Sequence, residues 1–246
     1  MSFRHAAKVP VAISNDAARL EVELRNDTSS RLVLREVFEH GTYAPIPGAA
    51  APRAILDVGA NQGITAAFFR LAYPEATIVC VEPDPATFPI LAENARRIGR
   101  CTAHQVALLD RDGQAPFASS SISVVSTLYD LPAPGIANER VDVALRHAGR
   151  FAEEAATAIG CAGFDLLKID TEGAELPILR ALGGLLAEVG TVHLEYHSLA
   201  DRAAIEALLA PTHTLARERV DAPERGTLSF LRRPAATLHG AETKMA

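Results

Sequence analysis

From Arg53 onward, short apolar runs alternate along the sequence with segments of helical spacing, and turns separate the two. The apolar runs cover residues 54–57, 77–82, 102–109, 164–170 and 191–196, and the helical segments cover 64–73, 88–98, 174–182 and 201–209. Apolar strands that alternate with helices indicate a parallel sheet that is buried on both faces. The fold class is therefore α/β, with helices on both faces of the sheet.

Other segments frame or interrupt this rhythm. Residues 1–50 read as an N-terminal module, with a hairpin formed by the runs 9–13 and 20–24 and a helix over 31–39. A linker at 45–52 leads into the main domain, 51–233, whose runs at 214–219 and 227–232 predict an antiparallel pair. The insertion at 110–163, with a helix expected over 143–159, is long for a connection, and we predict that it forms a lid. The tail, 234–246, is expected to fray.

Composition excludes several classes of protein. The 246 residues carry a net charge of -6, and no apolar run approaches the roughly 18–20 residues that cross a membrane. An acidic chain has no overall field that would hold a polyanion, so neither nucleic acid nor a membrane is an expected partner. Three widely spaced cysteines, without a basic and apolar leader, predict a reducing, cytoplasmic location. A homo-oligomer of this chain remains a possible partner arrangement.

The turn DVGANQG, at 57–63, lies between the first strand and the first helix. Glycines let the backbone turn sharply and bring a ligand close to the main chain, and the N-terminus of a helix favours negative charge. Glu82 ends the second strand, 23 residues after Gly59, where a carboxylate can accept hydrogen bonds from both hydroxyls of a ribose. The turn and this carboxylate together predict a nucleoside-binding site.

The residues of the turn also select the nucleoside. A dinucleotide-binding turn has the pattern G-x-G-x-x-G, whereas this turn has only Gly59 and Gly63. Asp57 precedes the turn, and its carboxylate would repel a pyrophosphate but would stabilise the ammonium group of a methionine moiety. S-adenosylmethionine carries a sulfonium and an ammonium group and no phosphate, so charge favours it over a nicotinamide dinucleotide.

Four segments resemble the FkbM-type family of S-adenosylmethionine-dependent methyltransferases: ILDVGANQG, CVEPDPATFPILAENA, HQVALLD and LLKIDTEGAELPILRAL. The segment SRLVLREVFEHGTY is similar to that family's helix before the first strand. The resemblance implies a class I methyltransferase fold, which is Rossmann-like with a mixed seven-stranded sheet. It also implies O-methylation of a hydroxyl on a small metabolite, natural product or sugar. The segment NERVDVALRHAGRF departs from the family's pattern before the fourth strand, which leaves the class of substrate open.

The same resemblance implies a set of cofactor-binding residues. It places the cofactor loop on Asp57, Gly59, Asn61 and Gly63, the ribose on Glu82 with Pro83 and Asp84 beside it, and the adenine near Val106 and Ala107.

Ionisable residues occupy two central strands that should otherwise be apolar. Lys168 and Asp170 share one face of the fourth strand, and His193, Glu195 and His197 share one face of the fifth. Because unpaired burial of such groups is costly, they must be either paired or functional.

Both readings stay open from the sequence. In the first, Lys168 forms a buried ion pair with Asp170 or Glu195 that holds the strand ends together. In the second, Asp170, Glu172, Glu195 and His197 form an acid–base site that deprotonates a hydroxyl, and Lys168 keeps its carboxylates ionised. Arginine fills 21 of the 24 basic positions, so a lysine here indicates a need for a compact ammonium group.

His193 lies deeper in its strand and is expected to be a core histidine. Asp170, Glu195 and His197 could converge on a divalent metal, but their spacing is not diagnostic, so no metal is predicted.

The favoured function is an S-adenosylmethionine-dependent O-methyltransferase that acts on a small hydroxylated molecule. Two alternatives use the same sheet: a nicotinamide-dependent oxidoreductase, and a cofactor-binding protein without catalysis.

Overall fold

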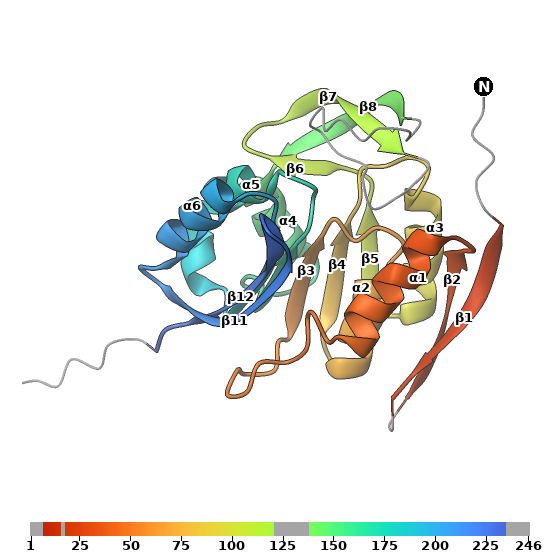
Figure 1. The fold of residues 1–246 in the computed structure, drawn as a ribbon, viewed down its shortest axis with the longest axis horizontal. Coiled ribbons are helices and arrows are strands. Elements are labelled where there is room, and N and C mark those ends of the chain that lie inside the picture. Colours follow the sequence, from red (N-terminus) through yellow and green to blue (C-terminus); the bar gives the residue numbers. More distant parts are fainter. Residues whose placement is uncertain (1–6, 16–17, 121–137, 235–246) are drawn as a thin grey trace, which may run out of the picture.

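The computed structural model describes residues 7–15, 18–120 and 138–234 (Figure 1). The strands are β1 Lys8–Ser14, β2 Arg19–Arg25, β3 Ala54–Val58, β4 Thr77–Val81, β5 Cys101–His104, β6 Ala107–Leu109, β7 Gly113–Ser120, β8 Asn138–His147, β9 Leu166–Ile169, β10 Thr191–Tyr196, β11 His213–Ala222 and β12 Arg225–Arg232. The helices are α1 Thr28–Leu34, α2 Ile64–Ala72, α3 Phe88–Ile98, α4 Ala148–Ala158, α5 Glu175–Leu182 and α6 Leu199–Leu209. A π-helical turn, η1 Arg35–Glu39, continues α1, and a 3-10 turn, η3 Gly183–Glu188, continues α5.

Seven strands form one mixed sheet in the order β11-β12-β10-β9-β3-β4-β5. Neighbouring strands from β10 to β5 are parallel, whereas β12 runs antiparallel to both β10 and β11. This arrangement confirms the predicted α/β fold and the predicted antiparallel closing pair. β3 lies between β4 and β9, so the strand that follows it in the chain and the later strand β9 lie on opposite sides of it. Ligands bind at such a switch point, beyond the carboxyl ends of the strands.

Helices cover both faces of the sheet, as the apolar runs predict (Figure 1). One face packs against α4, α5 and α6, and the other packs against α2 and α3. Every residue of β3 is buried, including the carboxyl group of Asp57. Val22 and Tyr43 of the N-terminal module belong to the same apolar cluster as Ile55 and Ile78 of the sheet, so the module shares the core of the main domain.

Two predicted elements are wrong in their details. The expected strand 102–109 is divided, because β5 belongs to the main sheet while β6 pairs with β8 in a separate three-stranded sheet. The helix expected over 143–159 begins only at Ala148, since the preceding residues are the end of β8. Val141, Val143 and Leu145 alternate along that strand and pack against Phe117, so the pattern there has period two.

The described part of the 110–163 insertion consists of β7, β8 and α4, and residues 121–137, in the middle of the predicted lid, lie outside the described residues. Most of the predicted tail also lies outside them.

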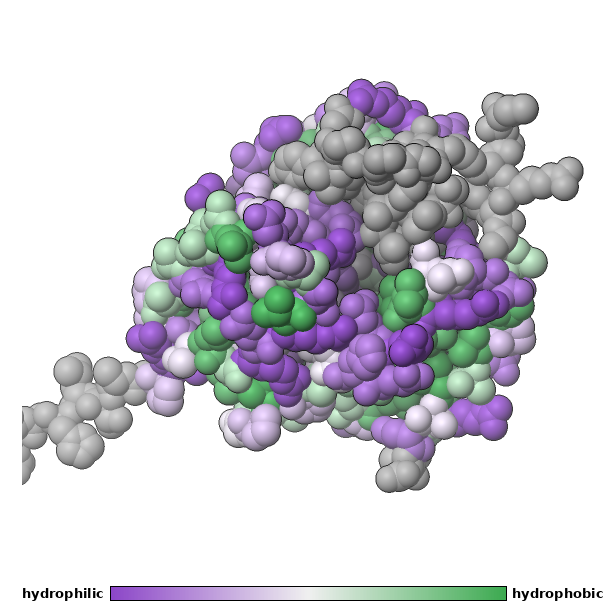
Figure 2. Space-filling view, viewed as in Figure 1, coloured by the Kyte–Doolittle hydropathy of each residue, from purple (hydrophilic) through white to green (hydrophobic). Residues whose placement is uncertain are grey.

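Figure 2 shows one face of the molecule, on which most residues are hydrophilic and the hydrophobic ones are scattered among them. None of the helices that the structure describes combines the length and the apolar character needed to cross a membrane.

Candidate active site

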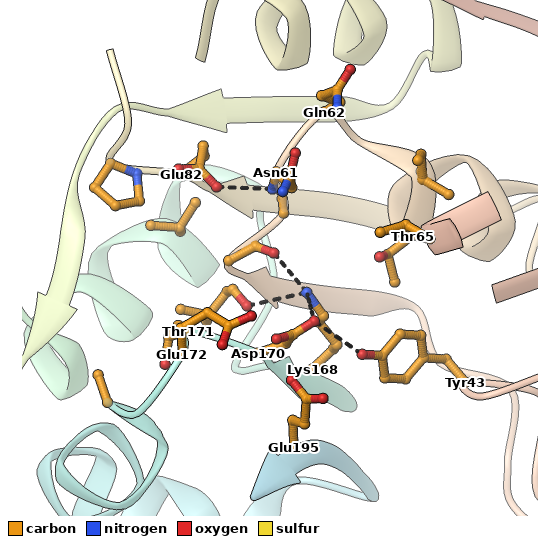
Figure 3. Close-up of a pocket in the computed structure, with 18 of the residues that line it drawn as sticks. Tyr43, Asn61, Gln62, Thr65, Glu82, Lys168, Asp170, Thr171, Glu172 and Glu195 are labelled. Atoms are coloured by element: carbon orange, nitrogen blue, oxygen red, sulfur yellow. Dashed lines mark hydrogen bonds and ion pairs between the residues drawn. The ribbon is translucent and has the colours of Figure 1, made fainter. Parts of the chain in front are cut away.

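An open cavity of about 1180 Å³, part of it continuous with solvent, lies at the carboxyl ends of β3, β4, β9 and β10. Figure 3 shows Glu82 and Asn61 on one side of it and Lys168, Asp170 and Glu195 on the other. We call these sides the Glu82 end and the acidic end. Its position beyond the carboxyl ends of the parallel strands is where ligands bind in open α/β sheets.

The glycine turn forms the floor between the two ends. Gly59 has a φ of +73°, and a Cβ at this position would lie only 1.8 Å from the backbone oxygen of Asp170. The absence of a side chain therefore lets the turn pack directly against the end of β9. Gly63 has a φ of +87° and is the N-cap residue directly before α2, and Asn61 also has a positive φ, which asparagine tolerates better than most residues.

Glu82 faces the cavity and is held by the backbone. Its Oε2 accepts a hydrogen bond from the Asn61 amide, and its Oε1 accepts one from the Asp84 amide, each at 2.9 Å. Burial raises the pKa of Glu82 to about 7, although these two hydrogen bonds oppose the shift. A carboxylate oxygen can accept more than one hydrogen bond, so both oxygens can still accept from ribose hydroxyls. Pro83, Val106 and Ala107 line the cavity beside it.

Three of the predicted cofactor-binding residues do not line the cavity, and each has a structural partner. Asp84 is buried and accepts hydrogen bonds from the Ala86 amide, the Thr87 hydroxyl and the Ser119 hydroxyl, which fixes the start of α3. Gly63 packs against α3. Asp57 has no exposed surface and forms an ion pair with Lys168, so its charge acts on the cavity only through that lysine.

Lys168 links the glycine turn to β9. Its ammonium nitrogen lies 3.2 Å from Asp57 Oδ1 and 3.7 Å from Asp170 Oδ2, and it donates a hydrogen bond to the Gly59 carbonyl at 2.7 Å. Burial alone would lower the pKa of Lys168, but the two carboxylates raise it above its ordinary value. The expected pairing with Asp170 is confirmed, whereas Glu195 forms its ion pair with Arg225 at 3.0 Å. The strongest partner, Asp57, was not expected.

The acidic end brings together three carboxyl groups, those of Asp170, Glu172 and Glu195, whose oxygens come within 4.8 Å of one another. Burial would raise the pKa of Asp170, but Lys168 and a hydrogen bond shared with Glu195 bring it below the ordinary value. Burial and the charge of Asp170 raise the pKa of Glu172 to about 7 and that of Glu195 well above its usual range. Of the three acids, Asp170 therefore has the lowest pKa, and its two neighbours lose their protons at higher pH.

The two histidines of β10 and its following turn differ in role. His193 is fully buried, its Nδ1 lies 2.8 Å from the Ser229 hydroxyl, and burial lowers its pKa to about 3, as expected for a neutral core histidine. His197 does not line the cavity and instead approaches Glu172, Glu175 and Glu195 at 3.6–3.8 Å. Burial would lower the pKa of His197, but Glu175 and Glu172 raise it.

Sequence reasoning missed three residues that line the acidic end: Glu36, Tyr43 and Arg225. The Tyr43 hydroxyl donates a hydrogen bond to Asp170 Oδ2 at 3.2 Å, and its ring lies 5.8 Å from the Lys168 ammonium nitrogen. Arg225 bridges Glu172 and Glu195. Glu36 and Tyr43 lie within the segment that resembled the family before the first strand, which was the one signal that pointed toward them.

Among the residues that the structure describes, the carboxyl groups that could together hold a metal ion are those of Asp170, Glu172 and Glu195, not the set with His197 that the sequence suggested. Arg225 already neutralises part of this charge.

The fold and the site define a class I, S-adenosylmethionine-dependent methyltransferase. The sheet has the expected order, a carboxylate at the end of β4 faces the cavity, and the carboxylate of Asp170 beside the turn disfavours a pyrophosphate. The chain belongs to the FkbM family, because the model of the methyltransferase FkbM domain matches residues 57–220. S-adenosylmethionine is its cofactor.

Relatives of known name are also methyltransferases. The chain is 29% identical over 189 residues to Methyltransferase 1 of Beauveria bassiana (strain ARSEF 2860), with 69% of this chain and 70% of the relative covered. It is 27% identical over 182 residues to the 2-O-methyltransferase NoeI of Sinorhizobium fredii (strain NBRC 101917 / NGR234), with 70% and 72% covered. A solved fibrillarin, the pre-rRNA processing protein of Methanococcus jannaschii, shares the fold with a TM-score of 0.51 at 12% identity, covering 91% and 82% of the two chains.

Proposed function

We propose that the protein transfers a methyl group to a hydroxyl of a small, polyhydroxylated molecule. The observation that carries this proposal is an ionised carboxylate, Asp170, flanked by two further carboxyl groups on the wall of an open cavity. Carboxyl groups are good partners for the several hydroxyls of a sugar or a polyol. The name of NoeI, a 2-O-methyltransferase, supports oxygen as the methylated atom.

In this proposal the cofactor spans the cavity. Glu82 accepts hydrogen bonds from the ribose hydroxyls, and Pro83, Val106 and Ala107 flank the adenine. Gly59 and Asn61 of the turn lie beneath the remainder, which extends toward the acidic end. When bound, S-adenosylmethionine supplies an electrophilic methyl group.

The acidic end then acts on the acceptor. Asp170 accepts the hydroxyl proton as the oxygen attacks, and Glu172 and Glu195 bind neighbouring hydroxyls or pass the proton on. Tyr43 and Lys168 are positioning residues, because each holds the Asp170 carboxylate from one side. His197 is a positioning residue for Glu172 and Glu195 rather than a base, since it does not line the cavity.

The test is methyl transfer from cofactor with a labelled methyl group to a panel of neutral monosaccharides and polyols, with the methylated atom identified by nuclear magnetic resonance. Asp170→Asn should lower the rate by roughly 10²–10⁴ with little change in cofactor affinity. Asp110→Asn is the control, because Asp110 is exposed, forms an ion pair with Arg111 and does not line the cavity.

Glu82→Ala should weaken cofactor binding at least about tenfold, since it removes a charged acceptor of two hydrogen bonds. Unchanged affinity in this variant, or a product methylated on nitrogen or carbon, would contradict the proposal. Calorimetry with nicotinamide dinucleotides tests the oxidoreductase alternative, for which we expect no binding.

A further inference from the structure

The acidic end carries more negative than positive groups. Six carboxyl groups from different elements face it or lie directly behind it: Glu36 of η1, Asp57 of β3, Asp170 and Glu172 after β9, Glu175 of α5, and Glu195 of β10. Within the described residues, the permanent cations that pair with this group are Lys168 and Arg225, while Arg219 approaches Glu36 but is shared with Asp221. His197 adds a charge only when it is protonated.

We propose that this excess of carboxyl groups makes the site select its nucleoside ligand by charge, so that the cationic cofactor binds more tightly than its neutral product, S-adenosylhomocysteine. The inference deepens the proposed function and rests on the orientation proposed there, with the ribose at Glu82. It assigns a role in product release to Glu36 and Asp170, beyond any contact with the acceptor.

The orientation puts the charge difference in the right place. The cofactor and its product differ in one feature, a sulfonium against an uncharged thioether. The Glu82 end is flanked by Pro83, Val106 and Ala107 and suits the uncharged adenosine that both molecules share. The remainder of the same cavity is the acidic end, where a partly buried unit charge interacts strongly with each carboxylate because the surroundings are less polar than water.

The charge balance of methyl transfer supports the same conclusion. The sulfur–methyl bond breaks and its electron pair stays on sulfur, the oxygen–methyl bond forms, and the hydroxyl proton passes to a carboxylate. The positive charge therefore leaves the ligand and arrives in the cluster as a proton. After the cluster has lost that proton to solvent, it is anionic again. The neutral product carries no positive charge on sulfur, so the cluster does not attract it.

The pKa directions agree with this geometry. Burial and neighbouring acids raise the pKa of Glu36, Glu172 and Glu195, so these groups lose their protons at a higher pH than ordinary carboxyl groups do. A cationic ligand would displace these protons, whereas a neutral one would not. Burial would lower the pKa of His197 but Glu175 and Glu172 raise it, and the loss of its proton as the pH rises also makes the cluster more negative. The preference for the cation should therefore increase as the pH rises.

Isothermal titration calorimetry of the whole protein measures the effect without any acceptor. The probes are S-adenosylmethionine, S-adenosylhomocysteine and sinefungin, in which a protonated amine replaces the sulfonium. At pH 7.5 we expect both cations to bind at least about fivefold more tightly than the neutral product, a factor at the lower end of measured coupling energies. The ratio of the affinities should be smaller at pH 6.

Two variants identify the groups responsible. Asp170→Asn and Glu36→Gln should each reduce the ratio of affinities, chiefly by weakening the two cations, with less than about a twofold change for the neutral product. Glu39→Gln is the matched control, because Glu39 lies on the same turn but is exposed and paired with Arg35. If Asp170→Asn does not fold by circular dichroism, Glu36→Gln decides the question.

Equal affinity for the cationic and neutral ligands in the wild-type protein, or an unchanged ratio in Glu36→Gln, would overturn the inference. Binding of none of the probes would overturn it together with the assigned orientation. A clear charge preference in a protein that methylates no hydroxyl would leave this inference standing and contradict the proposed function instead.

Discussion

Replacing Lys168 by methionine tests the most buried charge of the site. The substitution keeps the length of the side chain but removes the ammonium group that lies 3.2 Å from Asp57 Oδ1 and donates to the Gly59 carbonyl. Both Lys168 and Asp57 are almost fully buried, with exposed fractions of 1% and 0%. Asp57 would then be a buried carboxylate without a cation.

The expected loss of stability follows from that burial. Removing one member of a buried ion pair costs about 3–5 kcal/mol, because the remaining charge is not compensated. Burial already raises the pKa of Asp57 and Lys168 opposes the shift, so the pKa rises further in the variant. A carboxyl group with a raised pKa in the folded state makes stability fall as pH increases, by about 1.4 kcal/mol per pH unit, until the pH exceeds that pKa. The variant should therefore be closest to the wild type at low pH.

Urea denaturation followed by circular dichroism at pH 6 and pH 8 measures this loss. A double-mutant cycle with Asp57→Asn gives the coupling between the two residues, since Lys168→Met/Asp57→Asn no longer buries an unpaired carboxylate at position 57 and should recover most of the stability. Methyl transfer by the folded fraction of Lys168→Met should also fall, because Asp170 loses the ammonium group that lowers its pKa.

A loss below about 1 kcal/mol at pH 8, or no recovery in the double variant, would refute the electrostatic account of this pair. Normal turnover by the folded single variant would instead make Lys168 a purely structural residue.

Three further predictions follow from the same geometry. Gly59→Ala should destabilise the protein by more than about 2 kcal/mol in thermal unfolding, because its Cβ would clash with the Asp170 carbonyl, whereas Gly163→Ala, which has open space, should change stability by less than about 0.5 kcal/mol. The pKa of Glu82, about 7 against an ordinary 4.5, means that the folded state binds the extra proton. Without ligand the wild type should therefore lose up to about 3 kcal/mol relative to Glu82→Gln as the pH rises from 4.5 to 7, and a constant difference would argue against this shift. Tyr43→Phe should lower the rate of methyl transfer about tenfold with unchanged cofactor affinity and should move the pH profile upward, because Asp170 loses a hydrogen bond; an unchanged profile would leave Tyr43 without a positioning role.

The sequence by itself determined the sheet, the glycine turn and the carboxylate that faces the cavity at the end of β4. These features are local. Apolar runs with flanking helices define the parallel strands. Glu82 follows β4 directly, so the end of that one strand is enough to place it at the edge of the sheet. The alternation in β8 was equally local and was misread as a helix, although Val143 and Leu145 showed period two. The alternation of apolar residues that defines this strand is present in the sequence itself.

Only the tertiary structure decided which charges meet. Asp57 and Lys168 are directly opposite each other in the register of β3 and β9, a relation between residues 111 positions apart that no spacing along the chain encodes. Tyr43 reaches Asp170 from the N-terminal module, and Arg225 reaches Glu195 from a neighbouring antiparallel strand. Spacing along one strand shows which face a side chain takes, but its partner depends on how strands and loops pack together. For this reason the sequence located the carboxylates of the acidic end, and the fold determined in which direction the pKa of each is shifted.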